Sequence, residues 1–313
     1  MAVVVTHNRR DLLVESLTAL GAQDRVPDDV VVVDNASSDG TVGTVRDAFP
    51  EAHLLALSRN VGGAGGFAAG IAHALKHGAD LIWVMDDDTI PERAALAALL
   101  GARHRYEASA DAPALVASRV IWTDGRDHPM NTPRERPRVS RAQRSAATAA
   151  GCMAIRSASF VSLLLDADTV RERGLPIADY FLWNDDFEFT TRLVRGGSGL
   201  FCPGSVVVHK TRTFGSTDAD PGERFFYEVR NKVWLFTRSP GLAPVERLLY
   251  GGSTARRWVR TVVRSSDRAT LFRGLRTGLA AGVRTKPRPL DAILPDHGVS
   301  EPQETSPESG RQP

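Results

Sequence analysis

The chain has 313 residues, of which 42% are hydrophobic and 24% charged, with a formal net charge of +2. These values are ordinary for a globular core, and the length suffices for one large α/β domain with an appendage or for two domains. Cys152 and Cys202 are too few for a disulfide framework, and no stretch reaches the roughly 20 apolar residues of a membrane-spanning helix. The start also lacks a signal peptide. We therefore expect a cytoplasmic protein, either free or resting on the inner face of the plasma membrane.

The near-neutral charge hides an asymmetry late in the chain. Residues 241–290 carry 11 Lys and Arg against 2 Asp and Glu, whereas residues 291–313 carry 5 acids against 1 Arg. The basic character therefore belongs to one segment and not to the core.

Four apolar runs alternate with helical patterns over about the first 100 residues. The expected strands are 2–6, 30–33, 53–57 and 81–85, and the first is followed by a helix with Leu13, Leu17 and Leu20 on one side. Alternation of this kind predicts a parallel sheet with right-handed crossovers and helices on both faces.

Polar groups follow each of these runs. They are Thr6 to Arg9, Asp34 with Asn35, the loop of residues 60–66 with four glycines, and Asp86 to Asp88. In an open α/β sheet the carboxyl ends of parallel strands meet at one edge, where ligands bind. A nucleotide fits the set, because it needs an acid for base or ribose, a glycine loop for close backbone approach, and carboxylates for a metal on phosphates.

The Asp86–Asp88 triplet is the strongest single feature. Three crowded carboxylates repel one another unless a cation lies among them, and hard oxygen ligands suit Mg²⁺ or Mn²⁺. The alternative is a solvated acidic turn before a helix that starts near Pro91, since acids favour helix N-termini.

Two other enzyme classes compete. Gly63–Ala68 fits a loose G-x-G-x-x-A dinucleotide fingerprint with Asp86 about 20 residues on, which would indicate a dehydrogenase. The fingerprint, however, follows the third strand and not the first. A phosphohydrolase D-x-D-x-T motif would need its Thr one place later than Thr89.

The N-terminal half resembles family 2 glycosyltransferases, the inverting nucleotide-sugar enzymes of the GT-A fold. The resemblance rests on 3–9, 33–40, 60–66 and the Asp triplet as the family's D-x-D, and it extends over about Met1 to Arg238. Within the family the chain is most similar to actinobacterial galactofuranosyl- and rhamnosyltransferases of cell-wall assembly.

The second half has to provide a general base. Residues 181–189 place Asp185 and Asp186 in an aromatic, apolar setting, where low polarity raises a carboxyl pKa towards a useful value. The alternative is a carboxylate pair that simply opens a helix. By the resemblance Asp186 matches the base and Asp185 orients the acceptor.

The resemblance also implies the binding residues. Asp86, Asp88 and His209, the last at the end of a short strand 206–209, would hold Mn²⁺ or Mg²⁺, and Asp87 would lie closer to the ribose. The residues expected to contact the nucleotide sugar are Thr6, Asn8, Arg9, Asp34, Asn60, Gly62, Gly63, Asp86, Asp87 and Arg230. Arg230 is expected to pair with phosphate or with an anionic acceptor.

The expected organisation has three parts. Residues 1–238 form the GT-A domain, with a donor half at 1–120 and an acceptor half at 121–238. Residues 239–290 are a basic amphipathic helical segment, and 291–313 a disordered tail. Residues 123–145 are expected as a loop, and 211–223 as a lid.

The basic segment repeats apolar residues at helical spacing among arginines. The apolar residues are Trp258, Val259, Val262, Val263, Leu271, Phe272, Leu275 and Leu279. Such a segment can lie on an anionic membrane, pack on the core with a solvated arginine face, or contact nucleic acid. We favour the membrane, because a lipid-linked acceptor would require the protein to reach a membrane surface. We expect no nucleic acid partner.

The resemblance implies an inverting, metal-dependent glycosyltransferase. Its donor would be UDP-galactofuranose, otherwise dTDP-rhamnose or a UDP-hexose, and its acceptor a lipid-linked or cell-wall glycan. The alternatives are an NAD-dependent dehydrogenase and a non-catalytic sugar-nucleotide-binding relative.

Overall fold

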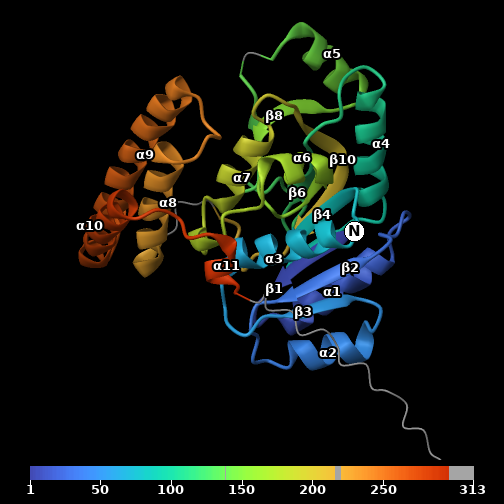
Figure 1. The fold of residues 1–313 in the computed structure, drawn as a ribbon, viewed down its shortest axis with the longest axis horizontal. Coiled ribbons are helices and arrows are strands. Elements are labelled where there is room, and N and C mark those ends of the chain that lie inside the picture. The colour runs from blue at the N-terminus through green and yellow to red at the C-terminus, as the bar shows by residue number, and fades with distance from the viewer. Residues whose placement is uncertain (138, 216–219, 296–313) are drawn as a thin grey trace, which may run out of the picture.

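One mixed sheet of ten strands runs through the computed structural model, which describes residues 1–137, 139–215 and 220–295 (Figure 1). Its first half is parallel, with the strands in the order β3-β2-β1-β4. These strands are β1 (Ala2–Thr6), β2 (Val30–Asp34), β3 (His53–Ala56) and β4 (Leu81–Asp86). The parallel half expected from the alternation is thus present.

Crossover helices cover both faces of this half. Leu13, Leu17 and Leu20 of α1 (Arg10–Gly21) pack on one face, and Phe67 and Ile71 of α3 (Gly62–Lys76) pack on the other. The second crossover contains α2 (Thr41–Ala48). Helix α3 lies so close to β1 that a Cβ on Gly66 or Gly70 would meet a valine side chain at 2.5 or 2.4 Å. Part of the glycine run therefore serves helix–sheet packing.

The second half of the sheet mixes directions. Its strands are β6 (Leu115–Ile121), β7 (Arg134–Glu135), β8 (Met153–Ser157), β9 (Leu163–Asp166) and β10 (Gly199–His209). Strand β9 lies antiparallel between β4 and β6, and so joins the two halves into one sheet. The helices of this half are α4 (Ala95–Glu107), α5 (Arg141–Ala149), α6 (Ala167–Arg173) and α7 (Asp185–Leu193), with a 3₁₀ turn η1 at Ala178–Tyr180.

A short strand replaces the helix start expected near Pro91. Strand β5 (Thr89–Pro91) pairs antiparallel with β10, in a register that puts His209 opposite Thr89. The helix begins only at Ala95. The alternative of an acidic turn at a helix start is therefore wrong, because the backbone after the Asp triplet is already used in the sheet.

Residues 123–145 are likewise more structured than the expected loop. They contain β7, which pairs with β8, and the start of α5, whose N-cap Ser140 accepts a hydrogen bond from Gln143 N. The high Arg and Pro content concealed both elements.

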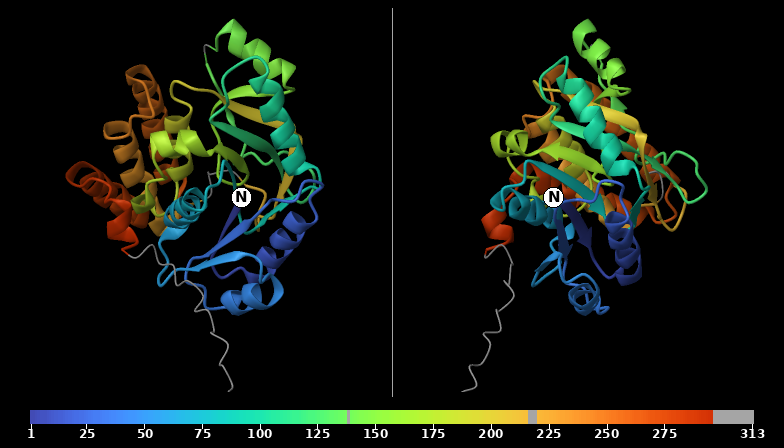
Figure 2. Two further views of the ribbon diagram at one scale, coloured as in Figure 1. Left: turned by 45° about the vertical axis from the view of Figure 1, so that its right-hand side comes forward. Right: turned by 90° about the vertical axis from the view of Figure 1, so that its right-hand side faces the viewer.

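The C-terminal helices form a separate layer beside the sheet (Figures 1 and 2). A 3₁₀ turn η2 (Gly222–Arg224) leads into α8 (Phe225–Thr237), which is followed by α9 (Pro244–Arg264) and α10 (Arg268–Arg284). Helix α10 packs closely on α8 through Gly274, Gly278 and Gly282, because a Cβ on Gly278 would lie 2.8 Å from Val229 Cβ.

The expected disordered tail begins with an ordered segment. Helix α11 (Leu290–Ile293) packs on the sheet domain through buried Ile293 and Leu294, and Arg59 donates to the carbonyl of Ile293 at 2.7 Å. The expectation for 291–313 is thus wrong for its first residues, whose apolar side chains find a place in the core. Residues 296–313, and 216–219 of the expected lid, lie outside the described residues. Among the helices described, none is both long and apolar enough to cross a bilayer.

Candidate active site

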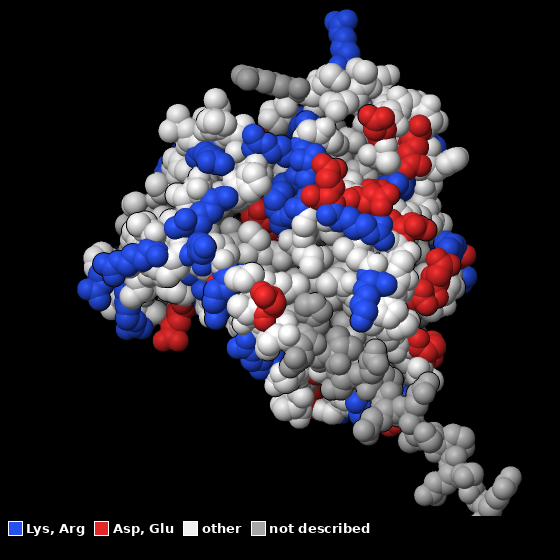
Figure 3. Space-filling view, in the orientation of Figure 1, with Lys and Arg blue, Asp and Glu red and all other residues white. Residues whose placement is uncertain are grey.

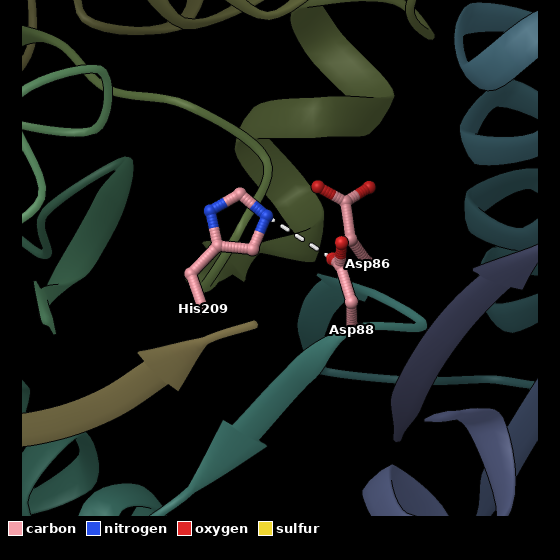
Figure 4. A group of neighbouring side chains, drawn as sticks. All are labelled: Asp86, Asp88 and His209. Atoms are coloured by element: carbon pink, nitrogen blue, oxygen red, sulfur yellow. Dashed lines mark ion pairs between the residues drawn. The ribbon is translucent and has the colours of Figure 1, made fainter. Parts of the chain in front are cut away.

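Asp86, Asp88 and His209 converge at the carboxyl end of β4 (Figure 4). Each offers one ligand atom, and these atoms all lie within 4.8 Å of one another. Asp86 ends β4 and Asp88 lies in the turn before β5. His209 ends β10 and is held beside them by the β5–β10 pairing and by a hydrogen bond from Lys210 N to Asp88 O at 2.8 Å. The three predicted metal ligands are therefore neighbours despite their separation in sequence.

Hydrogen bonds orient the imidazole of His209. Its Nδ1 lies 2.9 Å from Asn131 Oδ1, and the amide nitrogen of Asn131 donates to Ser159 Oγ at 3.0 Å. The amide oxygen therefore faces the ring and accepts from Nδ1–H, so Nε2 of the neutral ring points its lone pair at the acids. Sequence reasoning missed Asn131, which lies in an irregular segment far from His209 along the chain.

The donor set fits a divalent cation. His209 Nε2 lies 3.1 Å from Asp88 Oδ1. With the proton on Nδ1 there is no hydrogen between these two atoms, and this buried oxygen has no hydrogen-bond partner among the described residues. Burial, then the neighbouring Asp88 charge, raises the pKa of Asp86 to about 7. Two carboxylates and one imidazole suit Mn²⁺ or Mg²⁺, and a cation would relieve this repulsion.

Asp87 is directed away from this cluster. Its Oδ2 accepts from Thr6 Oγ1 at 2.8 Å, and Arg9 forms ion pairs with both Asp87 and Asp88. Burial raises the pKa of Asp87 to about 6, although Arg9 opposes the shift. Thr6 and Arg9, both predicted to contact the nucleotide sugar, thus hold the side chains of the Asp triplet in place.

The other residues predicted to contact the nucleotide sugar lie at or after the ends of β1, β2 and β3. Asp34 is buried, with Oδ2 accepting from Ser37 N at 3.0 Å and Oδ1 without a hydrogen-bond partner among the described residues. Asn8 Oδ1 accepts from Ser38 N at 2.7 Å, and Asn60 Oδ1 from Gly62 N at 2.8 Å. A buried carboxylate oxygen that lacks a donor is suited to a base or ribose group.

The two predicted glycines differ in their surroundings. Gly62 has φ +73°, and a Cβ there would lie 2.0 Å from the carbonyl oxygen of Phe181. Gly63 has open space around the position of its Cβ. Gly62 therefore allows the start of α3 to meet the loop before α7, whereas Gly63 leaves room for a ligand.

Asp185 and Asp186 open α7, and the charge of Asp86 acts on Asp185. Burial, then the charge of Asp186, then that of Asp86, raises the pKa of Asp185 well above its ordinary value. Burial also raises the pKa of Asp186, while the Phe187 amide, Lys232 and Arg134 act in the opposite direction. Asp186 Oδ1 accepts from Phe187 N at 2.6 Å, which leaves Oδ2 for a substrate.

The backbone before α7 is strained. Phe181, Trp183 and Asn184 all have φ +65°, in the left-handed region that residues other than glycine rarely adopt. Asn231 of α8 holds this loop by donating to the carbonyls of Tyr180, Leu182 and Trp183, each at 2.9 Å. Strain of this kind is retained where the surroundings enforce it, often at functional sites.

Arg230 supports the same loop. Its guanidinium donates to the carbonyls of Asp179 and Tyr180 and lies 4.3 Å from the centroid of the Trp234 ring. Arg230 and Asn231 thus both contact the loop that precedes α7.

Two further cations adjoin Asp186, and sequence reasoning missed both. Lys232 of α8 lies 4.7 Å from the centroid of the Phe187 ring, and Arg134 of β7 lies 5.5 Å from the same ring. Lys232 follows Glu228 by one helical turn, a spacing that is typical of an exposed helix face. Nothing in the sequence around it therefore predicts that it is buried. A cavity of about 250 Å³ at Met1, Asp29 and Leu81 lies at the amino ends of the strands, away from the site.

Residues 1–164 match the family described as Glycosyl transferase family 2. The chain is 33% identical over 278 residues to galactofuranosyltransferase GlfT1 of Mycolicibacterium smegmatis, covering 80% of this chain and 87% of the relative. It is 34% identical to GlfT1 of Mycobacterium tuberculosis H37Rv over 259 residues, covering 77% and 83%.

Solved structures share the fold. S. aureus TarS 1–349, in complex with UDP-GlcNAc, aligns with TM-score 0.61 and 16% identity over 93% of this chain and 82% of its own. The mannosyltransferase PcManGT from Pyrobaculum calidifontis, in complex with GDP-Man and Mn²⁺, aligns with TM-score 0.50 and 20% identity over 94% and 77%. The expected GT-A fold is confirmed, and the matches favour glycosyl transfer over the dehydrogenase and phosphohydrolase interpretations.

Proposed function

The chain belongs to glycosyl transferase family 2, and from this premise we propose that it is an inverting, metal-dependent enzyme that uses UDP-galactofuranose. The alternative donors are dTDP-rhamnose and a UDP-hexose. The observation that carries the proposal is the convergence of Asp86, Asp88 and His209 at a sheet edge within electrostatic reach of Asp185. Similarity to GlfT1 over most of both chains supports the choice of sugar.

Asp186 is the base in this proposal. The acceptor hydroxyl gives its proton to Asp186 Oδ2 as its oxygen bonds to the anomeric carbon, while the bond from that carbon to the diphosphate breaks on the opposite face. Burial favours a carboxyl that holds this proton. Asp185, beside it, orients the acceptor.

Asp86, Asp88 and His209 would hold Mn²⁺ or Mg²⁺, with Asn131 fixing the imidazole. When bound, the ion supplies positive charge against the oxygens of the departing diphosphate. We assign donor contacts to Thr6, Asn8, Arg9, Asp34, Asn60, Gly62, Gly63, Asp86 and Asp87. Arg230 is assigned to the loop, because backbone carbonyls already use its guanidinium.

The proposed acceptor is a lipid-linked or cell-wall glycan, reached from an anionic membrane surface. The apolar residues of the basic segment have two environments: Trp258, Val262 and Leu275 pack towards α8, whereas Val259, Val263 and Phe272 are exposed. On α9 the exposed ones continue a stripe begun by Val245, Leu248 and Leu249, and Arg256 and Arg260 flank it. We call this stripe with its arginines the α9 surface.

Lys and Arg gather over α9 and α10 in Figure 3. Exposed apolar residues between arginines are suited to an anionic bilayer, where the apolar groups enter the interface and the arginines meet the head groups.

The proposed function is tested by thermal unfolding with a panel of nucleotide sugars in Mn²⁺ or Mg²⁺. UDP-galactofuranose should stabilise the fold by about 2.7 kcal/mol at a hundredfold excess over its dissociation constant, and less without metal. Stabilisation by NADH in place of every nucleotide sugar would support the dehydrogenase. Binding without any detectable transfer to glycan acceptors would support the non-catalytic alternative.

A further inference from the structure

Two cations beside the proposed base have no ion pair with any of the residues that the structure describes. Lys232 is only 8% exposed, and its ammonium also makes no hydrogen bond within the described part of the chain. Arg134 is exposed, lies 5.5 Å from the Phe187 ring and 5.6 Å from the Tyr250 ring, and has no carboxylate partner there either. The ring next to Asp186 is thus flanked by two positive charges.

The nearby acids do not neutralise these cations. Glu228 already accepts from Asn184 Nδ2 at 2.7 Å, from Arg257 and from Trp258 Nε1 at 3.2 Å. Asp186 uses Oδ1 to accept from the Phe187 amide of its own helix, and it forms no ion pair with Lys232 or Arg134. Burial without a close partner lowers the pKa of Lys232 to about 8, although Glu228 and Asp186 oppose this.

A buried ammonium without a partner destabilises a fold by an amount of the order of several kcal/mol, so its retention at a site calls for a ligand that uses it. Two cations within 4.7 and 5.5 Å of the centroid of one aromatic ring match an anion with two charges. Phosphate has this charge and several acceptor oxygens for both donors.

We propose that Lys232 and Arg134 form an anion-binding subsite that takes a phosphate group of the acceptor and so helps to place its hydroxyl against Asp186. The proposal rests on the proposed function for the identity of the base. It adds two specificity residues from α8 and β7, outside the family motifs.

The subsite is tested by calorimetric titration of inorganic phosphate into protein saturated with UDP and Mg²⁺, so that the donor site is filled. Wild type should bind phosphate saturably, and Lys232→Met and Arg134→Met should each weaken it at least about tenfold, as loss of a charged hydrogen bond does. Arg46→Met, an exposed arginine of α2, is the matched control and should bind phosphate like wild type. Equal phosphate binding by all four proteins, or none by wild type, overturns the subsite.

Further measurements distinguish failure of the subsite from failure to fold and from failure of the proposed function. Lys232→Met should unfold at the same temperature as wild type or higher, because it removes a buried charge; if it does not fold, the exposed Arg134→Met decides alone. UDP binding by wild type tests the proposed function independently of phosphate. Flotation of Lys232→Met with phosphatidylglycerol vesicles should equal that of wild type, and lost flotation would assign the pair to membrane lipid and overturn the acceptor role.

Discussion

Asp86, Asp87 and Asp88 are consecutive, yet their side chains contact different partners. Asp86 and Asp88 face His209, whereas Asp87 accepts from Thr6 and pairs with Arg9. Asp86 ends β4, and Asp87 and Asp88 form the tight turn before β5, so the turn directs Asp87 towards Thr6 and returns Asp88 to the side of His209. Only the outer two acids are therefore available to an ion.

Asp186→Asn and Asp88→Ala should separate chemistry from binding. The first removes the base but keeps the shape, so transfer should fall about a thousandfold while UDP binding with Mn²⁺ stays near the wild-type value. The second removes a metal ligand, so metal-dependent UDP binding itself should weaken. Calorimetry with UDP and a UDP-release assay measure the two quantities. Equal loss of UDP binding in both variants would contradict the division of roles.

Phosphate binding at the proposed subsite should weaken as pH rises through about 8. Lys232 has a pKa of about 8 in the fold, where Glu228, Arg257, Arg134 and Asp186 face it, against 10.5 ordinarily. It is charged below pH 8 and loses its proton above it, which removes one of two cations. Titrations on both sides of this pH measure the change.

Stability provides the control for this pH dependence. Between pH 8 and 10.5 the unfolded chain binds the Lys232 proton and the fold does not, so this group makes stability rise with pH in that window. Lys232→Met should abolish both effects, whereas Arg134→Met should keep them. A phosphate affinity that is constant across the window would contradict the role of Lys232.

At the scale of elements, the start of α3 and the loop before α7 depend on each other. Ala64 N donates to Phe181 O at 3.2 Å, and Gly62 allows the two backbones to approach. The glycine motif thus links the first half of the chain to the strained loop before α7, which begins with Asp185 and Asp186.

Gly62→Ala should destabilise the fold by at least about 1–3 kcal/mol, because it adds a Cβ at φ +73° against the Phe181 carbonyl. Gly63→Ala is the matched control: its Cβ would meet only open space, so stability should be near wild type. If that space holds the donor, Gly63→Ala should still weaken UDP binding. Chemical denaturation and UDP titration measure both, and equal stabilities would contradict the packing role of Gly62.

The parallel half of the sheet and its crevice could be predicted from the sequence. The β-branched runs indicate the strands, and the polar residues that follow them indicate the crevice at the carboxyl ends. The chemistry of the Asp triplet alone indicated a cation there, but His209 was placed with it by resemblance alone, because the sequence around His209 does not show that β10 pairs with β5. The subsite cations and Asn131 were not predictable. Their positions follow from tertiary packing of α8 and of residues 123–145, which no local pattern records.

The basic segment shows another limit of sequence patterns. Helical periodicity correctly indicates helices at 244–264 and 268–284, but it cannot decide which apolar residues face inwards when two sides of a helix are apolar. Glycines of α10 settle this by docking that helix on α8, which leaves Phe272 and the α9 surface outside.

At the scale of the whole molecule, α9 adjoins both solvent and the acceptor side. Arg257 and Trp258 of α9 bind Glu228, which also accepts from Asn184 at the start of α7. A membrane under the α9 surface would therefore lie within one layer of helices from the base.

Vesicle flotation tests the α9 surface. Wild type should float with anionic vesicles at low salt, less at high salt, and not with zwitterionic ones, because arginines near an anionic surface contribute about 1 kcal/mol each. The double variant Leu248→Gln, Leu249→Gln should float poorly but unfold at the wild-type temperature, since these side chains are 78% and 68% exposed. Val26→Gln, an exposed apolar residue of the N-terminal half, is the control. Wild type that stays unbound at low salt would contradict the membrane proposal.

The pairing of β5 with β10 also has a consequence for biosynthesis. Two of the three proposed ion ligands emerge from the ribosome more than a hundred residues before His209 does, and Thr89 pairs with the same late strand. A nascent chain halted before β10 would carry the acids of the triplet without the imidazole. Binding of a divalent ion to ribosome-bound intermediates of increasing length would therefore report the chain length at which β10 pairs with β5.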